Sequence, residues 1–274
     1  MKAKKTAVHI LICRPFREIM SRSGGHAAPL PTVKRSLSRN PAMVAYAVSP
    51  PSPAVLDIVG TDEKFPVRRI YCIGKNYLAH IREMNADERD PPVIFMKPAD
   101  ALVPGGGEIP YPVFTSNLHY ECELVVAMKS GGYNIPESEA SSHIFGYAVG
   151  LDMTRRDHQA AALEKGLPWE VTKAFDKSAP VGPITPVSQT GIMTTGHVKL
   201  QVNGETRQDA DISLLIWKID EIISKISEQH ALMPGDIILT GTPAGVGAVV
   251  SGDVLDCSVD GLEPMQVRIG APAA

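Results

Sequence analysis

Two glutamates that flank a single cysteine form the first group of residues suited to chemistry. Glu121, Cys122 and Glu123 stand at the start of an apolar run that is typical of a β-strand. Side chains two residues apart leave the same face of a strand, so both carboxylates point one way and Cys122 points the other. Asp152 follows a second apolar run, residues 146–151, and can bring a third carboxylate to the same place. Three carboxylates favour a hard divalent ion, Mg2+, Mn2+ or Ca2+, over zinc or copper.

A histidine and a glutamate three residues apart form the second group. His80 and Glu83 lie in a segment with a helical pattern, residues 76–84, in which positions i and i+3 are neighbours. Glu83 can therefore orient His80 and stabilise its charge. Histidine titrates in the range that a general base needs. A surface pair without a catalytic role has the same spacing.

Arginine, glutamine and lysine side chains supply candidates for contact with a substrate. Arg156 and Gln159 share one helix face shortly after Asp152, where a guanidinium and an amide can clamp a carboxylate or an oxo group. Lys173 stands in a mostly apolar stretch, which is compatible with an electrostatic role beside a developing anion. Arg156 and Gln159 could instead belong to an ordinary solvated helix face. Lys173 could instead pack its aliphatic stem along apolar surface with its ammonium group in water.

A glycine-rich loop follows the predicted strand over residues 236–239. The loop runs from Gly241 to Gly247 and lacks the Gly-Lys-Ser/Thr sequence of a phosphate-binding P-loop. No helix start follows it, so nucleotide binding is disfavoured. The backbone amide of Gly241 and the hydroxyl of Thr242 are candidates for contact with a substrate.

A mixed, mostly β fold with few helices must position these residues. Of the 274 residues 44% are hydrophobic and 5% aromatic, and 23 glycines with 23 prolines indicate many turns between short strands. Strands are predicted over residues 69–74, 93–96, 123–128, 145–151, 198–202, 236–239 and 265–269. Hairpin turns are predicted at Asn203-Gly204 and Asp260-Gly261. Helices are predicted over residues 76–84, 154–165 and 213–227, and isoleucines line one face of the last.

Charge divides the chain into two unequal parts. Residues 1–42 contain nine basic residues and one acidic residue, a net charge of +8, within a chain whose total is −3. Because this segment lacks hydrophobic periodicity, we predict a disordered basic extension, with Met43 a candidate natural start. Its composition also matches an organellar transit peptide. Residues 43–66 are predicted to be a lead-in segment and residues 67–274 the catalytic domain.

Several classes of protein are disfavoured by the composition. The four cysteines form no Cys-x-x-Cys pair, which argues against a disulfide scaffold or a thiolate zinc site and fits the reducing cytosol. No apolar run reaches the roughly 18 residues that a membrane helix needs. Aromatic residues that could stack on bases are nearly absent from the basic extension, so we predict no binding to nucleic acid.

Taken in order, these segments resemble the fumarylacetoacetate hydrolase family over roughly residues 66–270. The matching stretches are Ile73 to Tyr77 before His80, Met96-Lys97-Pro98, Tyr120 to Leu124, Gly146 to Asp152, Arg156 to Gln159, Lys173 to Asp176, and Pro234 to Pro243. The resemblance implies a catalytic fold of mixed β-sheets or a β-roll with peripheral helices. It also implies a homodimer and a small diketo acid as the substrate.

The resemblance further implies roles for individual residues. Glu121, Glu123 and Asp152 would be the ligands of Mg2+ or Mn2+. The water-activating pair would be His80 and Glu83, on a lid that orders over the substrate. Lys173 would be catalytic, and the substrate would be bound by Lys97, Arg156, Gln159, Gly241 and Thr242. Animal members of the family have an additional aspartate ligand before the histidine, whereas residues 72–79 contain no carboxylate, which favours a site with three ligands.

The activity implied by the resemblance is metal-dependent hydrolysis of a carbon–carbon bond in a 1,3-diketo acid. Residues 96–101, 117–119 and 152–157 look most like the members that act on fumarylpyruvate in gentisate breakdown. Oxaloacetate decarboxylation and isomerisation of a carboxylated hydroxymuconate are the alternatives, since all three reactions pass through enolates. A non-catalytic binding module on the same fold is disfavoured, because such a module could lose these residues without losing its fold.

Overall fold

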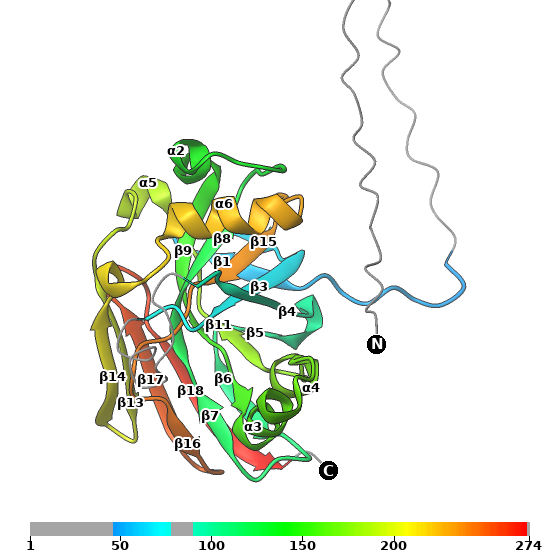
Figure 1. Ribbon diagram of the computed structural model, residues 1–274. Helices are drawn as coiled ribbons and strands as arrows, with labels where there is room; N and C mark the ends of the chain where they lie inside the picture. The colour runs from blue at the N-terminus through cyan, green and yellow to red at the C-terminus, as the bar shows by residue number, and fades with distance from the viewer. Residues whose placement is uncertain (1–45, 78–89, 273–274) are drawn as a thin grey trace, which may run out of the picture. The chain divides into compact units, whose positions relative to one another are not determined.

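Short strands are the main regular structure of the described chain, which comprises residues 46–77 and 90–272 of the computed structural model (Figure 1). The strands are β1 (Val55–Ile58), β2 (Thr61–Pro66), β3 (Arg69–Gly74), β4 (Val93–Lys97), β5 (Leu102–Pro104), β6 (Gly107–Tyr111), β7 (Leu118–Tyr120), β8 (Cys122–Met128), β9 (Ile144–Leu151), β10 (Thr154–Arg155), β11 (Ala179–Val181), β12 (Thr185–Pro186), β13 (His197–Val202), β14 (Glu205–Asp211), β15 (Asp236–Leu239), β16 (Gly247–Val249), β17 (Val254–Val259) and β18 (Met265–Pro272). Every strand predicted from the sequence is present, and the mostly β fold is confirmed.

Two large sheets carry most of these strands. An eight-stranded sheet has the order β4-β3-β15-β8-β9-β11-β5, with β12 paired to β9. A five-stranded sheet has the order β14-β13-β17-β18-β6. The other two sheets in the described residues are small and have the orders β10-β7-β16 and β1-β2. Asn203 and Gly204, both with positive φ, form the predicted two-residue turn between β13 and β14.

The alternation of side chains along β8 connects the two halves of the core. Leu124 and Val126 belong to a hydrophobic cluster that also contains Leu200 of β13 and Leu255 of β17, in the five-stranded sheet. The intervening Val125 and its neighbour Ala127 belong to the other cluster, with residues of β1 and β2. Both faces of β8 are therefore buried, as expected for a continuous apolar run in a central strand.

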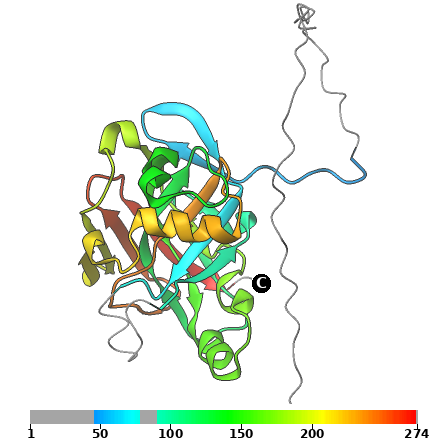
Figure 2. The same cartoon turned by 45° about the horizontal axis from the view of Figure 1, so that its top comes forward.

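Helices are few and short within residues 46–77 and 90–272. They are α2 (Glu137–Ala140), α3 (Arg156–Lys165), α4 (Glu170–Lys173), α5 (Val187–Thr190) and α6 (Ile219–Gln229), with 3-10 turns at Ala99–Ala101, Ser141–His143 and Ile212–Leu214. Gly166 ends α3 in the left-handed conformation, as its position after the helical pattern predicts. Helix α6 crosses the strands of the eight-stranded sheet in both views (Figure 1, Figure 2).

The helix predicted over residues 213–227 begins later, at Ile219. Asp211 accepts a hydrogen bond from the backbone of Ser213 and closes a separate 3-10 turn. The Asn76 side chain then binds the backbone N–H and C=O of Trp217, which holds this segment in a non-helical conformation. From Ile219 onwards the predicted apolar face is correct, because Ile222, Ile223 and Ile226 are buried.

The compact domain begins before the predicted boundary at Val67. Strands β1 and β2 precede it and pair in antiparallel fashion. Leu56 is fully buried and Phe65 is nearly so, and both belong to the core beside the eight-stranded sheet. The segment expected to be only a lead-in is therefore part of the compact unit that starts at Pro51. It was missed because β2 is mostly polar and exposed, without a clear two-residue repeat.

The remaining predictions concern residues outside the described part. The basic extension over residues 1–42 lies there, as do residues 78–84 of the first predicted helix. No helix within residues 46–77 and 90–272 is long and apolar enough to cross a membrane.

The Tm of chains shortened at the N-terminus shows whether residues 1–42 or the strands β1 and β2 contribute to stability. We predict that a chain beginning at Met43 has the same Tm as the full chain, because it retains β1 and β2. A chain beginning at Val67 loses Leu56, Ile58 and Phe65, each a buried side chain of a type that contributes about 1.5–3 kcal/mol. Its Tm should fall strongly or the chain should not fold. A lower Tm for the chain beginning at Met43, measured by calorimetry, would show that residues 1–42 contribute to stability.

Candidate active site

Three carboxylates converge where β8 begins and β9 ends. The two strands are antiparallel, and Cys122 pairs with Leu151 while Glu123 pairs with Gly150. This register places Glu121 and Glu123 beside Asp152, whose backbone N–H donates to the Glu121 carbonyl over 2.9 Å. One oxygen from each of the three carboxylates lies within 4.8 Å of the other two. The convergence predicted from the sequence is thus present in the structure.

Cys122 points away from this group. Its side chain is fully buried in the cluster that joins the two large sheets, and its Sγ lies 3.8 Å from the carbonyl oxygen of Lys199 in β13. The two-residue repeat of the strand therefore separates the thiol from the two flanking carboxylates, as predicted.

Basic side chains surround two of the three carboxylates. The ammonium of Lys173 lies 2.7 Å from Glu121 Oε2 and 2.6 Å from Asp152 Oδ2. The ammonium of Lys97 lies 2.9 Å from Asp152 Oδ1, and the guanidinium of Arg156 lies 2.6 Å from Glu121 Oε1. The side chains of Glu121 and Asp152 are 10% and 1% exposed and Glu123 is also buried, so solvent contributes little to the stabilisation of the three carboxylates.

These pairs shift the pKa values of the groups involved. Burial raises the pKa of Glu121, but Lys173 and Arg156 more than reverse this and lower it to about 2. Burial likewise lowers the pKa of Lys173, and the carboxylates of Asp152 and Glu121 raise it above its ordinary value instead. Glu121 is therefore an anion and Lys173 a cation at neutral pH.

Glu123 differs from the other two carboxylates because no basic side chain of the described chain pairs with it. Its Oε2 accepts a hydrogen bond of 2.7 Å from the backbone N–H of Gly241. Burial, followed by the nearby charges of Asp152 and Glu121, holds the pKa of Glu123 well above its ordinary value. Gly241 has a φ of +102°, and a Cβ there would lie 2.7 Å from Cβ of Asn76. Only glycine presents this N–H without strain.

The arrangement fits a divalent cation. Three buried carboxylates within reach of one point supply the hard oxygen ligands that Mg2+ and Mn2+ prefer. The buried Oδ1 of Asp152 receives no hydrogen bond from the described residues, although the Lys97 charge lies close to it. This atom and the unpaired Glu123 carboxylate are the acceptors that a cation would satisfy.

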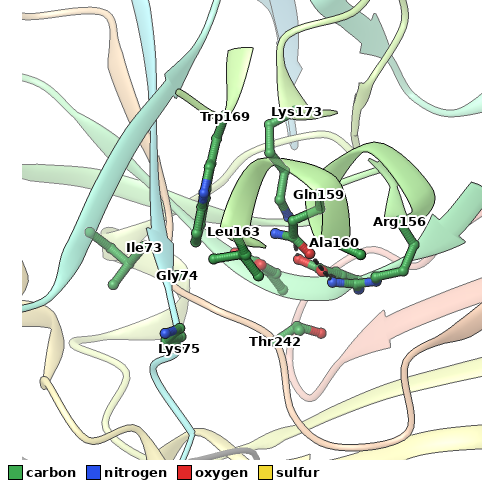
Figure 3. Close-up of a pocket in the computed structure, with 12 residues that line it drawn as sticks. Ile73, Gly74, Lys75, Arg156, Gln159, Ala160, Leu163, Trp169, Lys173 and Thr242 are labelled. Atoms are coloured by element: carbon green, nitrogen blue, oxygen red, sulfur yellow. Dashed lines mark hydrogen bonds and ion pairs between the residues drawn. The ribbon is translucent and has the colours of Figure 1, made fainter. Parts of the chain in front are cut away.

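A cavity of about 230 Å³ opens beside the carboxylates (Figure 3). Helix α3 contributes Arg156 and Gln159, whose side chains are hydrogen-bonded to each other, and α4 contributes Lys173. The other lining residues are Ile73, Gly74, Lys75, Glu121, Glu123, Ala160, Leu163, Trp169 and Thr242. The predicted pair on one helix face therefore faces the cavity.

Three of the residues expected to bind the substrate make contacts within the protein. The Lys97 side chain is fully buried, contacts Asp152 and the carbonyl oxygens of Met153 and Lys173, and does not line the cavity. Gly241 acts through its N–H on Glu123. Thr242 lines the cavity, but its hydroxyl donates to the Cys122 carbonyl over 2.9 Å. Their observed contacts hold the carboxylate-bearing strands in place. His80 and Glu83 lie outside the described residues.

Two polar residues of the site were not assigned a role from the sequence. His119 Nδ1 accepts from Arg156 Nε over 3.3 Å, and its Nε2 lies 3.0 Å from Asn117 Oδ1. Burial, and then the Arg156 charge, lower the pKa of His119 to about 4, so it is neutral and can accept this bond. His119 stands two residues before Glu121, so in an extended chain both side chains lie on the same side. This spacing could have indicated that His119 belongs to the site.

Gln208 was the second residue missed. Its side chain is buried, accepts from the Cys122 N–H over 3.0 Å, and donates to Thr242 Oγ1 and to the Pro243 carbonyl over 2.8 Å each. It thereby joins β8 to the glycine-rich loop. No local pattern marks it, because its partners are distant in sequence.

Comparisons with known proteins agree with this geometry. Residues 69–270 match the family model described as fumarylacetoacetate (FAA) hydrolase C-terminal. The mitochondrial oxaloacetate tautomerase of Homo sapiens is 42% identical over 205 residues, which cover 75% of this chain and 93% of that protein. The fumarylpyruvate hydrolase of Ralstonia sp is 43% identical over 176 residues, covering 64% of this chain and 91% of that protein.

A solved structure gives the same result. The crystal structure of fumarylpyruvate hydrolase from Pseudomonas aeruginosa, in complex with Mn2+ and pyruvate, superimposes with a TM-score of 0.81 and 50% sequence identity. The match covers 83% of this chain and 100% of that one. The chain is therefore an enzyme of the fumarylacetoacetate hydrolase family.

Proposed function

We propose that this enzyme is a divalent-metal-dependent hydrolase that cleaves an acylpyruvate, with fumarylpyruvate as the preferred substrate. The observation that carries the proposal is the group of three buried carboxylates at the wall of a cavity that also presents Arg156, Gln159 and Lys173. The similarity to the fumarylpyruvate hydrolase of Pseudomonas aeruginosa supports the choice of substrate.

Glu121, Glu123 and Asp152 would hold the ion, Mg2+ or Mn2+, and the Mn2+ in that related structure supports this choice. When bound, such an ion supplies a Lewis acid that polarises the oxygens of a 2-oxo acid and stabilises negative charge that develops on them. Lys97 contacts Asp152, and the Gly241 N–H donates to Glu123, so both contacts would help to orient the proposed ligands.

The polar residues of α3 and α4 would bind the 2-oxo acid end of the substrate. The Arg156 guanidinium is fixed by Glu121, His119 and Gln159, and a fixed planar donor is suited to a carboxylate. The ammonium of Lys173 lies between Glu121 and Asp152, and as a cation it would stabilise negative charge that develops on the substrate.

The reaction needs a base, and we assign this role to His80, supported by Glu83. His80 removes a proton from water, and the resulting hydroxide adds to the carbonyl carbon distant from the 2-oxo acid. The carbon–carbon bond then breaks, and its electron pair leaves with the methylene carbon as the enolate of pyruvate. Protonation of that carbon gives pyruvate, and the other product is fumarate.

Oxaloacetate tautomerase activity is the second candidate. The 42% identity to the mitochondrial oxaloacetate tautomerase of Homo sapiens supports it. Moving a proton between carbon and oxygen of oxaloacetate also creates an enolate beside a carboxylate, and the same cationic groups would stabilise it. The homodimer and the cytosolic location stay predictions, and the mitochondrial name of this relative agrees with the organellar alternative for residues 1–42.

A substrate panel distinguishes the two candidates. With Mg2+ or Mn2+ present, we expect fumarylpyruvate to lose its diketone absorbance and to yield equal amounts of fumarate and pyruvate, and we expect EDTA to abolish this reaction. The conversion of enol to keto oxaloacetate is measured on the same preparations. Metal-dependent tautomerisation without cleavage of any acylpyruvate would reject the hydrolase and support the second candidate.

Metal binding should depend on three residues and not on the cysteine between two of them. Residues that only support metal ligands typically change affinity about 10- to 100-fold. We therefore expect Glu121→Gln, Glu123→Gln and Asp152→Asn each to weaken Mn2+ binding more than about 100-fold in calorimetric titrations. Cys122→Ala, on the opposite strand face, should leave the affinity unchanged. Equal loss in the Cys122 variant would mean that the orientation of the strand is wrong.

The base is tested by separating kcat from inhibitor binding. General-base catalysis typically contributes about 10²- to 10⁴-fold, so His80→Ala should lower kcat by that order. Oxalate, which mimics the 2-oxo acid end, should bind this variant as it binds the parent enzyme. Glu83→Gln should lower kcat less, because an amide can orient the ring but cannot offset its charge. Near-normal kcat in His80→Ala, or a matching loss of oxalate affinity, would place the base elsewhere.

A further inference from the structure

The basic side chains that line the cavity differ in whether a carboxylate pairs with them. Arg156 is paired with Glu121, and Lys173 is paired with both Glu121 and Asp152. Lys75 lines the same cavity, and its side chain forms no ion pair or hydrogen bond with any residue of the described chain. The cavity therefore contains one positive charge without a partner in ranges 46–77 and 90–272, separate from the cluster that holds the three carboxylates.

Lys75 lines the cavity with its backbone in an unfavourable conformation. Its φ is +60°, in the left-handed region that residues other than glycine seldom adopt. The next residue, Asn76, is fixed by hydrogen bonds from its side chain to the carbonyls of Trp217 and Thr240 and from the Trp217 N–H. Strained backbone that the surrounding structure enforces is concentrated at functional sites.

Lys75 and Arg156 lie at opposite sides of the cavity (Figure 3). The wall of the same cavity also includes the apolar side chains of Ile73, Leu163 and Trp169. A ligand whose 2-oxo acid end is bound beside Arg156 would pass along this apolar surface towards Lys75. The lining thus matches a molecule that has an acidic group at each end and an uncharged middle.

We propose that Lys75 binds the distal carboxylate of the substrate and makes the enzyme selective for dicarboxylic over monocarboxylic 2-oxo acids. This inference rests on the proposed function, because it takes the 2-oxo acid end to lie beside Arg156 and the carboxylates. Fumarylpyruvate carries such a distal carboxylate, whereas acetylpyruvate ends in a methyl group. The Lys75 ammonium and the distal carboxylate would form a charge-assisted hydrogen bond, with no covalent step.

Binding of two inert analogues tests this selectivity without turnover. 2-Oxoadipate and 2-oxohexanoate have the same number of carbons in the chain and differ in the distal carboxylate. Calorimetric titration of the Mn2+-loaded protein should show tighter binding of 2-oxoadipate. Hydrogen bonds to charged groups typically contribute enough for about a 10- to 100-fold change in affinity, and Lys75→Met should lose that preference. Its affinity for 2-oxohexanoate should stay unchanged.

Two variants control for charge and backbone. Lys75→Arg keeps the positive charge and should keep most of the preference. Lys177 is an exposed lysine with nearly the same φ, +59°, and does not line the cavity, so Lys177→Met should bind both analogues like the parent protein. If Lys75→Met weakens both analogues equally, or if it retains the preference for 2-oxoadipate, the assignment of Lys75 is wrong.

Turnover separates failure of this inference from failure of the proposed function. Lys75→Met should lower kcat/KM for fumarylpyruvate about 10- to 100-fold, mainly through KM, and should leave kcat/KM for acetylpyruvate unchanged. Equal losses for the two substrates would reject selectivity by Lys75 while leaving the hydrolase intact. If the parent enzyme cleaves neither substrate, the proposed function fails, and the analogue titrations still decide whether Lys75 recognises a distal carboxylate.

Discussion

Repulsion among three buried carboxylates is the constraint on which the site depends. Glu121, Glu123 and Asp152 lie within a few ångströms of one another in a place that water hardly reaches. Isolated buried charges are expensive, and removing one partner of a buried ion pair typically costs about 3–5 kcal/mol. Lys173 and Lys97 reduce the repulsion at Asp152, and Arg156 reduces it at Glu121. Glu123 accepts a hydrogen bond from one backbone donor and pairs with no basic side chain of the described chain, which fits the proposed binding of a cation.

The fold supplies these charges from segments that are far apart in the chain. The antiparallel register of β8 and β9 fixes the carboxylates, and the packing of both faces of β8 makes that register rigid. The glycine-rich loop after β15 provides the N–H of Gly241, and Gln208 ties the loop to β8. Helices α3 and α4 add Arg156, Gln159 and Lys173 to the wall of the cavity. Function therefore resides in a small polar region built on an apolar sheet.

Sequence reasoning located the carboxylates because their positions follow from local rules. The two-residue repeat of a strand separates Glu121 and Glu123 from Cys122, and an apolar run ends just before Asp152. The α3 pair was found for the same reason, since three residues separate Arg156 from Gln159. The long apolar strands were predicted because burial on both faces leaves a continuous hydrophobic pattern.

The features that were missed depend on contacts between distant segments. The Asn76 side chain binds the backbone of Trp217, 141 residues later in the chain, and so keeps the segment before α6 out of a helix. No helical pattern in the sequence reveals this contact. The buried contact between Lys97 and Asp152 was not predicted, because the packing of neighbouring strands decides whether a lysine faces a cavity or a carboxylate behind it. Strands β1 and β2 were missed because polar side chains cover their exposed faces. Gln208 likewise acquires its role only when β14 is folded against β8.

The central claim is that Glu121, Glu123 and Asp152 together bind one divalent cation. The most direct measurement is anomalous diffraction from crystals of the protein grown with Mn2+ and oxalate. A single strong anomalous peak within coordination distance of all three carboxylates, with Lys173 still paired to Glu121 and Asp152, is the predicted result. A well-ordered site with no anomalous peak at these carboxylates, or a peak held by other residues, would contradict the claim.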